Sequence, residues 1–272
     1  MRCYLKNKPK VLIRAWGGLG NQFFQIILAL SIATNRNGKV LVDSASGYIK
    51  DKYHRRYMLE EIFNIDAEKV KRPRLYYFLL RNLSKFSKYF SKCYITDSRI
   101  IELNSHLTCD SIVCEGYFQS GYDYNKIRRM VAGKIALKST GKSKSYYRKE
   151  VAVHVRITDH ASEFCMGQFI KTVIERYGHD WSLVTILTND IDATRLLLKN
   201  FEIKFECIEA DELEALNYLA HSQNVIIGYS SFGWMGAFLN KDANVFCPKA
   251  NFSDLNFVWN DEKILDQWVA VK

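Results

Sequence analysis

The sequence predicts an α/β protein built on parallel, doubly wound sheets, and three observations lead to this prediction. Residues 11–16 (VLIRAW) read as a buried strand, 17–22 as a glycine-rich turn, 22–35 as a helix and 39–43 as a second strand. This order is that of a parallel strand–helix–strand unit. The same alternation resumes after residue 150. A chain of 272 residues, 48% of them apolar, can bury two cores of this kind.

The first half continues with elements of both kinds. Residues 68–95 are basic and aromatic and read as helical, 111–118 read as a strand, and 124–137 read as a helix. The polar, basic segment 138–150 (KSTGKSKSYYRKE) has few aliphatic residues and reads as a linker. The two predicted domains are therefore 1–140 and 141–272.

The second half repeats short apolar strands and helices. Its predicted strands are 150–157, 182–190, 204–210, 224–231 and 244–248. Its predicted helices are 166–177, 193–200, 212–221 and 232–239. Open parallel sheets bind ligands outside the carboxyl ends of their strands. Because polar residues gather at those ends in both halves, we expect a site in a cleft that the two halves share.

Composition limits the class of protein further. The net charge of +10 suits an anionic partner such as nucleic acid, anionic lipid or a phosphorylated small molecule, or it reflects a solvated lysine surface. The seven cysteines form no CxxC motif and are odd in number, so we expect reduced, mostly buried thiols in a cytoplasmic protein. No signal peptide is visible, and the longest uncharged apolar run, 23–33, is too short to span a bilayer.

The first candidate motif is GGLGNQ, at 17–22. The glycines Gly17, Gly18 and Gly20 let the backbone approach a ligand closely, and the helix that follows offers unpaired N–H groups to a phosphate. The amide of Asn21, like that of the neighbouring glutamine, can bond ligand hydroxyls or phosphate oxygens. The pattern is neither GxGxxG nor a Walker loop. Glycine turns between strand and helix are also common without any ligand.

The second motif is HVRITD, at the end of a predicted strand. Strand alternation puts His154 and Arg156 on one face. The guanidinium can bind phosphate or carboxylate oxygens with two donors, and the imidazole can bond a base or a phosphate. Asp159 can orient the arginine or act on a hydroxyl. The structural alternative is a buried Arg–Asp pair that only holds the strand end.

The third motif is GYSSFGW, at 228–234, where a strand again meets a helix start. Ser230 and Ser231 either cap the helix or donate to a phosphate at its N-terminus. Phe232 either stacks on a base or belongs to the core.

Two acidic groups allow more than one interpretation. Asp190 and Asp192 form a D-x-D pattern, which can hold Mn²⁺ or Mg²⁺ but is more often a helix cap or a solvated edge. Asp190, Asp211 and Glu214 are also candidates to accept hydrogen bonds from the N–H groups of a bound base.

The basic, aromatic segment 68–95 has three interpretations. It is an amphipathic helix packed on the first half, a face that meets a membrane surface, or a single-stranded nucleic-acid binder.

Together the motifs resemble glycosyltransferase family 11, the α-1,2-fucosyltransferases, in its bacterial type. The resemblance rests on these stretches in order: GGLGNQFFQ, HRRYMLEEIFNI (54–65), GYFQS (116–120), HVRITD, LTND and YSSFGWMGAFLN (229–240). It runs from about residue 11 to 250. The pair GGLGNQ and HxRxxD in one chain is its most specific part.

The resemblance implies a GT-B type fold, with two Rossmann-like halves, and an inverting transfer of L-fucose from GDP-fucose to the 2-hydroxyl of galactose. The acceptor would be a surface polysaccharide or O-antigen type of glycan, in some cases lipid-linked, at the cytoplasmic side or peripheral at the inner face of the membrane. No metal, other cofactor or nucleic-acid partner is expected. By resemblance Arg156 holds the diphosphate, His154 lies near guanine or phosphate, and Asn21 faces the sugar-phosphate. The segment of Ser230, Ser231 and Phe232 would line the nucleotide site.

The chain departs from the family pattern in ways that affect specificity. Ile157 stands where the family has a second arginine. Alternatives are therefore another nucleotide-sugar donor, or a noncatalytic basic binder of nucleic acid or anionic membrane. The general base is not fixed by the pattern: Asp159 is the first candidate, and Asp43, His160 and Glu163 are others.

Overall fold

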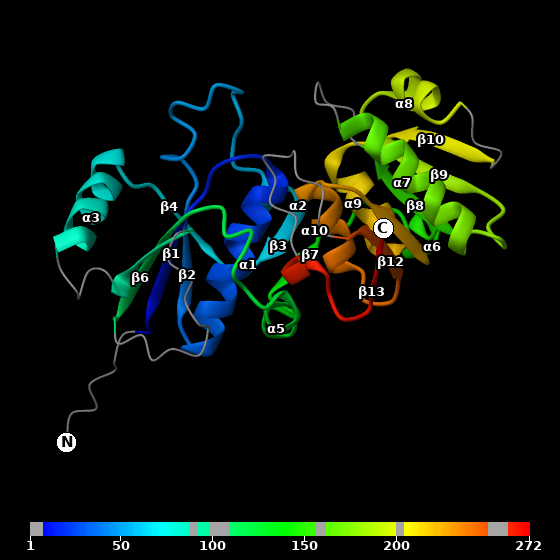
Figure 1. The fold of residues 1–272 in the computed structure, drawn as a ribbon. Helices are drawn as coiled ribbons and strands as arrows, with labels where there is room; N and C mark the ends of the chain where they lie inside the picture. The colour runs from blue at the N-terminus through cyan, green and yellow to red at the C-terminus, as the bar shows by residue number, and fades with distance from the viewer. Residues whose placement is uncertain (1–7, 87–91, 98–108, 156–161, 200–203, 250–260) are drawn as a thin grey trace. The chain divides into compact units, whose positions relative to one another are not determined.

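The computed structural model describes residues 8–86, 92–97, 109–155, 162–199, 204–249 and 261–272 (Figure 1). The chain divides into two compact units, Met1–Ala136 and Leu137–Lys272. Each unit holds one parallel sheet of its own. The predicted α/β class is thereby confirmed, and each unit is described by itself below.

The first unit is built on a five-stranded parallel sheet in the order β4-β2-β1-β6-β5. Its strands are β1 (Lys10–Arg14), β2 (Lys39–Asp43), β4 (Glu68–Val70), β5 (Tyr94–Thr96) and β6 (Ser111–Glu115). Chain order runs outward from β1 through β2 to β4, and the later strands lie on the other side of β1. The order therefore reverses between β1 and β6, where parallel sheets commonly bind ligands.

Helix α1 (Leu19–Asn35) explains the apolar run that follows the glycine turn. It packs on β1 and β2 and on α5 (Tyr124–Met130), and nearly all of its residues are buried. A helix covered on all sides has no solvated face that would need charged residues. The sequence FFQIILALSIA is thus that of a central helix in the first unit.

Two predicted helices of this unit are partly wrong. The helix expected over 124–137 ends at Met130, because Gly133 adopts φ +77°, and β7 (Ile135–Leu137) follows and pairs with β3 (Phe63–Ile65). In the part of segment 68–95 that the structure describes, helix α3 (Arg74–Phe86) lies between β4 and β5, and Lys92 and Cys93 are also helical. Pro73 explains its start, since the residue before a proline avoids the helical conformation. A short helix, α2 (Leu59–Ile62), precedes β3.

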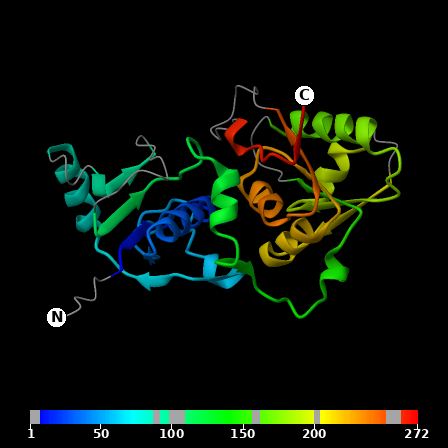
Figure 2. The same ribbon diagram turned by 90° about the horizontal axis from the view of Figure 1, so that it is seen from below.

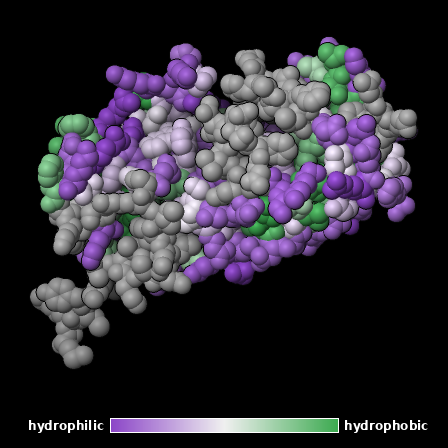
Figure 3. All heavy atoms as spheres, in the orientation of Figure 1, coloured by the Kyte–Doolittle hydropathy of each residue, from purple (hydrophilic) through white to green (hydrophobic). Residues whose placement is uncertain are grey.

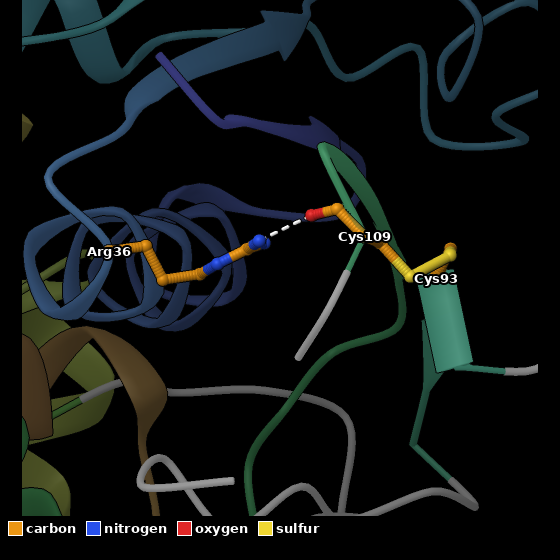
Figure 4. Close-up of a disulfide and its surroundings, with 3 residues drawn as sticks. All are labelled: Arg36, Cys93 and Cys109. Carbon is orange, nitrogen blue, oxygen red and sulfur yellow. Dashed lines mark hydrogen bonds between the residues drawn. A yellow bond between two sulfur atoms is a disulfide. The ribbon is translucent and has the colours of Figure 1, made fainter. Parts of the chain in front are cut away.

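The first unit also contains a disulfide between Cys93 and Cys109, with Cα atoms 5.8 Å apart (Figure 4). Cys93 comes directly before β5 and Cys109 shortly before β6, and these strands are parallel neighbours. Their starts therefore lie side by side, which the sequence spacing did not reveal. Arg36, just after α1, donates to the carbonyl oxygen of Cys109.

The expectation of reduced cysteines is therefore wrong for this pair. Among the described residues the free cysteines are Cys114, Cys207 and Cys247. Burial raises the pKa of the Cys114 thiol to about 12, and that of Cys247 likewise. Because one disulfide is present, cysteine content no longer argues for a cytoplasmic location.

The second unit is built on a six-stranded parallel sheet in the order β10-β9-β8-β11-β12-β13. Its strands are β8 (Val151–Val155), β9 (Val184–Thr188), β10 (Phe205–Glu209), β11 (Asn224–Ile227), β12 (Asn244–Pro248) and β13 (Trp268–Val271). Numbered within the unit, this is the order 3-2-1-4-5-6 of the Rossmann fold. The strand order reverses between β8 and β11, and in this strand pair Ile227 lies beside His154.

Helices cover both faces of this sheet. They are α6 (Lys144–Tyr147), α7 (Ser162–Tyr177), α8 (Ile191–Leu197), α9 (Glu212–His221) and α10 (Ser231–Leu239). Figure 2 shows α7 and α8 on one face and α9 and α10 on the other. The core beneath α7 consists of β-branched and aromatic side chains such as Val153, Ile186 and Phe246. Within the described ranges, no helix combines the length and apolar character needed to cross a bilayer.

Candidate functional site

The turn between β1 and α1 has a backbone conformation that strongly favours glycine. Gly17 has φ +80°, and a Cβ there would lie 2.9 Å from Nδ2 of Asn21 and 3.1 Å from the ring of Tyr117. Gly18 is the N-cap residue of α1 and lacks a side chain to occupy the first helical N–H groups. Gly20 is buried within the first turn of α1. The turn therefore brings unencumbered backbone to the carboxyl end of β1.

The two amides of the motif differ in role. The Gln22 side chain is 1% exposed, and its Nε2 donates to the carbonyls of Gly17 (3.0 Å) and Arg56 (2.9 Å). Its Oε1 accepts from the N–H of Met58 at 2.9 Å. Gln22 therefore braces the turn against the loop that follows β2. Asn21 is half-buried, and its Oδ1 accepts from Nε2 of Gln119 at 2.6 Å.

The segment after β6 is held in a strained conformation beside this turn. Phe118 has φ +55°, which is unusual for a residue with a large side chain. The Asp97 carboxylate accepts from the N–H of Tyr117 (2.9 Å) and of Phe118 (2.6 Å), while the hydroxyl of Tyr124 donates to the Phe118 carbonyl (2.6 Å). These contacts fix where Tyr117 and Gln119 point.

A pocket of about 310 Å³ opens at the carboxyl ends of β1, β2 and β6. It is lined by Trp16, Gly17, Gly47, Lys50, Asp51, Lys52, Arg55 and Tyr117. Trp16 and Tyr117 meet edge to face, with ring centroids 5.7 Å apart. Aside from Gly17, sequence reasoning missed these residues. The available signal was the basic stretch 50–56 directly after a strand end.

One of the three pocket cations is already paired. Nε of Arg55 donates to both carboxylate oxygens of Asp51, at 2.9 and 3.2 Å. Burial alone would raise the pKa of Asp51, but the hydrogen bonds from the Tyr53 N–H and from Arg55 outweigh it and lower that pKa. Asp51 therefore stays ionised and offsets Arg55. Lys50 and Lys52 give the lining its excess of positive charge.

A buried ionic cluster holds the start of the loop that forms this pocket. Arg14, at the end of β1, donates to the hydroxyl (2.9 Å) and carbonyl (3.0 Å) of Ser46 and pairs with the buried carboxylate of Glu115. Glu115 also accepts from Arg81 at 2.7 Å. Asp43, a candidate base in the sequence, is 0% exposed and accepts from the N–H and hydroxyl of Ser46. The Asp43 carboxylate therefore has a structural role.

The second unit places four of the predicted donor-binding residues at its sheet reversal. His154, on β8, lies against Phe232, with ring centroids 5.0 Å apart and planes 31° apart. Ser230 caps α10 by accepting from the N–H of Gly233 at 3.3 Å, which is the capping alternative that the sequence left open. Ser231 begins α10 and is half-buried, as are Ser230 and Phe232. A Cβ on Gly233 would lie 3.2 Å from Nδ1 of His154, so glycine permits this approach.

The acidic residues of the second unit are helix caps and surface groups. Asp190 caps α8 by accepting from the N–H of Ala193 at 3.0 Å, and Asp192 lies 3.8 Å from Arg195 on the surface. Asp211 caps α9, and Glu214 pairs with Lys142 at 2.5 Å. In the part of the chain that the structure describes, no group of three or more His, Cys, Asp or Glu side chains is placed to hold a metal ion.

Two predicted catalytic residues, Arg156 and Asp159, lie outside the described residues, as does His160. Arg156 directly follows β8, the strand beside the sheet reversal. Three statements therefore stay predictions: the role of Arg156, the role of Asp159 and the cleft expected between the halves.

The fold places the chain in a defined class: an α/β protein of the GT-B type, with a Rossmann-like sheet in each unit. More particularly, it is the fold of the fucosyltransferase NodZ from Bradyrhizobium, which the chain matches with a TM-score of 0.56 and 13% identity over 88% of this chain and 95% of that one. The α-1,6-fucosyltransferase NodZ soaked with GDP-fucose matches with a TM-score of 0.53 and 15% identity, over 86% and 93% of the two chains.

A plant protein shares the fold as well. Arabidopsis thaliana FUT1, in complex with GDP, matches with a TM-score of 0.57 and 11% identity over 91% of this chain and 71% of that one. No family model matches the sequence, and no curated protein matches it either. The likeness is therefore one of fold.

Proposed function

We propose that the protein is an inverting fucosyltransferase that transfers L-fucose from GDP-fucose to the 2-hydroxyl of a galactose residue on a surface glycan. The observation that carries the proposal is the reversal between β8 and β11, where His154, Phe232 and the start of α10 meet directly before the HxRxxD arginine. Two solved proteins of this fold hold GDP-fucose or GDP. The α-1,2 linkage rests on the family resemblance alone, since NodZ is an α-1,6 enzyme.

The second unit is the proposed donor-binding half. Phe232 and His154 offer aromatic faces to guanine, while the first N–H groups of α10 and the Ser231 hydroxyl can donate to the diphosphate. Arg156 supplies the charge that the departing GDP requires. As the C1–O bond breaks, negative charge grows on the β-phosphate, and one preorganised donor of this kind lowers the barrier by roughly 3–4 kcal/mol.

The first unit is the proposed acceptor half. Its pocket offers the rings of Trp16 and Tyr117, which suit the apolar faces of a sugar, and the lysines Lys50 and Lys52 as donors to hydroxyls. Asn21, positioned by Gln119, is the proposed contact to the reacting sugar. The acceptor hydroxyl attacks C1 from the side opposite GDP, and its proton passes to a base, for which Asp159 is the proposed residue. No metal takes part in the proposed reaction.

The test is an assay of the full chain with GDP-fucose and a panel of galactosides, with the product linkage read by NMR. We expect an α-1,2-fucosylated product with and without EDTA. Replacing Arg156 with alanine should reduce turnover by at least a hundredfold, while Arg148→Ala, an exposed arginine of the same unit, should leave it unchanged.

Three results would contradict the proposal. Transfer from a different nucleotide sugar would make the protein another glycosyltransferase. Absence of any transfer, with binding of RNA or of anionic lipid alone, would make it a noncatalytic binder. Full activity of Arg156→Ala in a folded variant would remove the proposed role of that residue.

A further inference from the structure

Helix α3 carries an apolar face that the first unit does not cover. Its members are Leu75 (61% exposed), Phe78 (60%), Leu79 (50%), Leu83 (44%) and Phe86 (88%). Their spacing follows the turns of one helix face. Figure 3 shows hydrophobic surface at the end of the first unit that α3 occupies in Figure 1. Scattered exposed apolar residues are normal in proteins, but several on one helix face mark an interaction surface.

The opposite face of α3 is fixed on the sheet, so the exposed face has a defined orientation. Tyr77 is 1% exposed and, with Leu80 at the edge, packs against the cluster of Leu12, Tyr94 and Val113. Arg81 adds an ion pair to the buried Glu115. Turning α3 to hide its outer face would break both contacts. Helix α3 therefore packs one apolar face on its own unit and leaves its second apolar face uncovered.

The charged residues along the chain from Lys69 to Phe86 have one sign. From Lys69 to Phe86 the chain has six cationic residues and no carboxylate, and the cations are Lys69, Lys71, Arg72, Arg74, Arg81 and Lys85. Lys69 pairs with Glu60 and Arg81 with Glu115. The other four are exposed. An apolar stripe with cations beside it is the pattern of helices that lie in the interface of an anionic bilayer.

We propose that α3 docks the protein on an anionic lipid surface, with its outer apolar face in the headgroup region and its cations on lipid phosphates. This goes beyond the proposed transfer reaction and does not depend on it. A protein partner would have to present an apolar groove bordered by acidic residues. A bilayer that contains phosphatidylglycerol offers both an apolar interior and anionic headgroups over a wide area. These properties favour the lipid surface over a protein partner.

The test is sedimentation of the full chain with vesicles of phosphatidylcholine, with and without 30% phosphatidylglycerol. We expect at least tenfold tighter partitioning onto the anionic vesicles and a marked loss in 0.5 M salt. Phe78→Ser with Phe86→Ser should weaken partitioning at least tenfold. Leu196→Ser, a 65% exposed leucine on α8, is the matched control and should bind as the unaltered chain does. Circular dichroism and thermal unfolding verify that each variant is folded.

A second pair of variants separates charge from apolar contact. Arg72→Gln with Arg74→Gln should weaken binding to anionic vesicles and leave the weak binding to neutral vesicles unchanged, whereas Lys241→Gln should change neither. Equal binding to both vesicle types, or full binding by the folded Phe78 and Phe86 variant, would overturn the proposal. So would a dimer in light scattering that this variant abolishes while no vesicle binds, since the face would then join two copies of the chain.

Discussion

At the scale of residues, His154 and Phe232 are the pair that most directly tests the proposed donor-binding role of the second unit. If guanine stacks on Phe232, replacing that residue with alanine should weaken GDP binding about tenfold, ~1.4 kcal/mol, as stacked bases do elsewhere. Titration calorimetry of the folded variant measures this. Tyr177→Ala is the matched control, because Tyr177 stacks on Phe246 in the same unit and is 42% exposed. Equal GDP affinity in both variants would contradict the stacking role.

The buried carboxylate of Glu115 allows a second residue-scale prediction. Glu115→Gln removes the charge that faces Arg14 and Arg81 and leaves a buried guanidinium without its partner charge. We expect the free energy of unfolding to fall by about 3–5 kcal/mol. Urea unfolding measures it, with Glu61→Gln as control. Glu61 pairs with Arg56 on the surface, where the expected loss is below ~1 kcal/mol. Similar losses in the two variants would argue against this account.

Sequence reasoning located polar residues at strand ends but could not assign all of their roles. Gln22 and Asp43 look like ligand or catalytic groups by position, yet both are buried and bonded to backbone groups. Asp190 and Ser230 likewise each cap a helix, with a side-chain oxygen that accepts from a backbone N–H. A motif tells which residues lie at a turn. It does not tell whether a side chain faces the ligand or the loop beneath it, because that depends on segments far away in sequence.

At the scale of elements, the disulfide joins the starts of β5 and β6 and closes a loop with a sequence separation of 16. Replacing Cys93 and Cys109 with serine should lower the free energy of unfolding by about 3 kcal/mol, since a loop of that length gains this much chain entropy when unfolded. Urea unfolding without reductant measures the change. Cys207→Ser, a free and half-buried cysteine, should be close to neutral. Thiol titration that found both cysteines free would contradict the pairing.

Central strands were more predictable than edge strands. Strands β2 and β12 and helix α9 match their predicted ranges, because each combines a clear apolar pattern with a distinct boundary. Of the edge strands of the two large sheets, β10 was predicted, whereas the short strands β4, β5 and β13 were missed. An edge strand is covered on fewer sides, so its sequence needs less apolar content and its pattern is weak.

At the scale of the whole molecule, ligand binding should appear as added stability. GDP at 100 times its dissociation constant should stabilise the folded chain by about 2.7 kcal/mol, which thermal unfolding detects as a raised midpoint. ADP and UDP at equal concentrations are the controls and should act more weakly if guanine is read by the second unit. Equal shifts with all three nucleotides, or none with any, would contradict a GDP site.

The fold class followed from the sequence because two runs of strand, turn and helix are visible in it. The linkage and the acceptor did not follow, since the proposed acceptor pocket depends on the loop after β2 and on side chains such as Lys50 and Tyr117. Those residues follow strands β2 and β6, which lie on either side of β1 only once the sheet forms. In the chain, Trp16 and Tyr117 are 101 positions apart.

The loop after β2 is anchored at both ends by groups that belong to the scaffold. Ser46 is held by Arg14 and Asp43 at its start, and Gln22 holds the backbone of Arg56 and Met58 at its close. Gly47 is fixed as well, since a Cβ there would lie 2.0 Å from the Ala15 carbonyl oxygen. Under the proposed acceptor assignment, grafting 48–55 from another chain with the same anchors is expected to change which glycan is modified, and natural variation among proteins with this loop is expected to concentrate there.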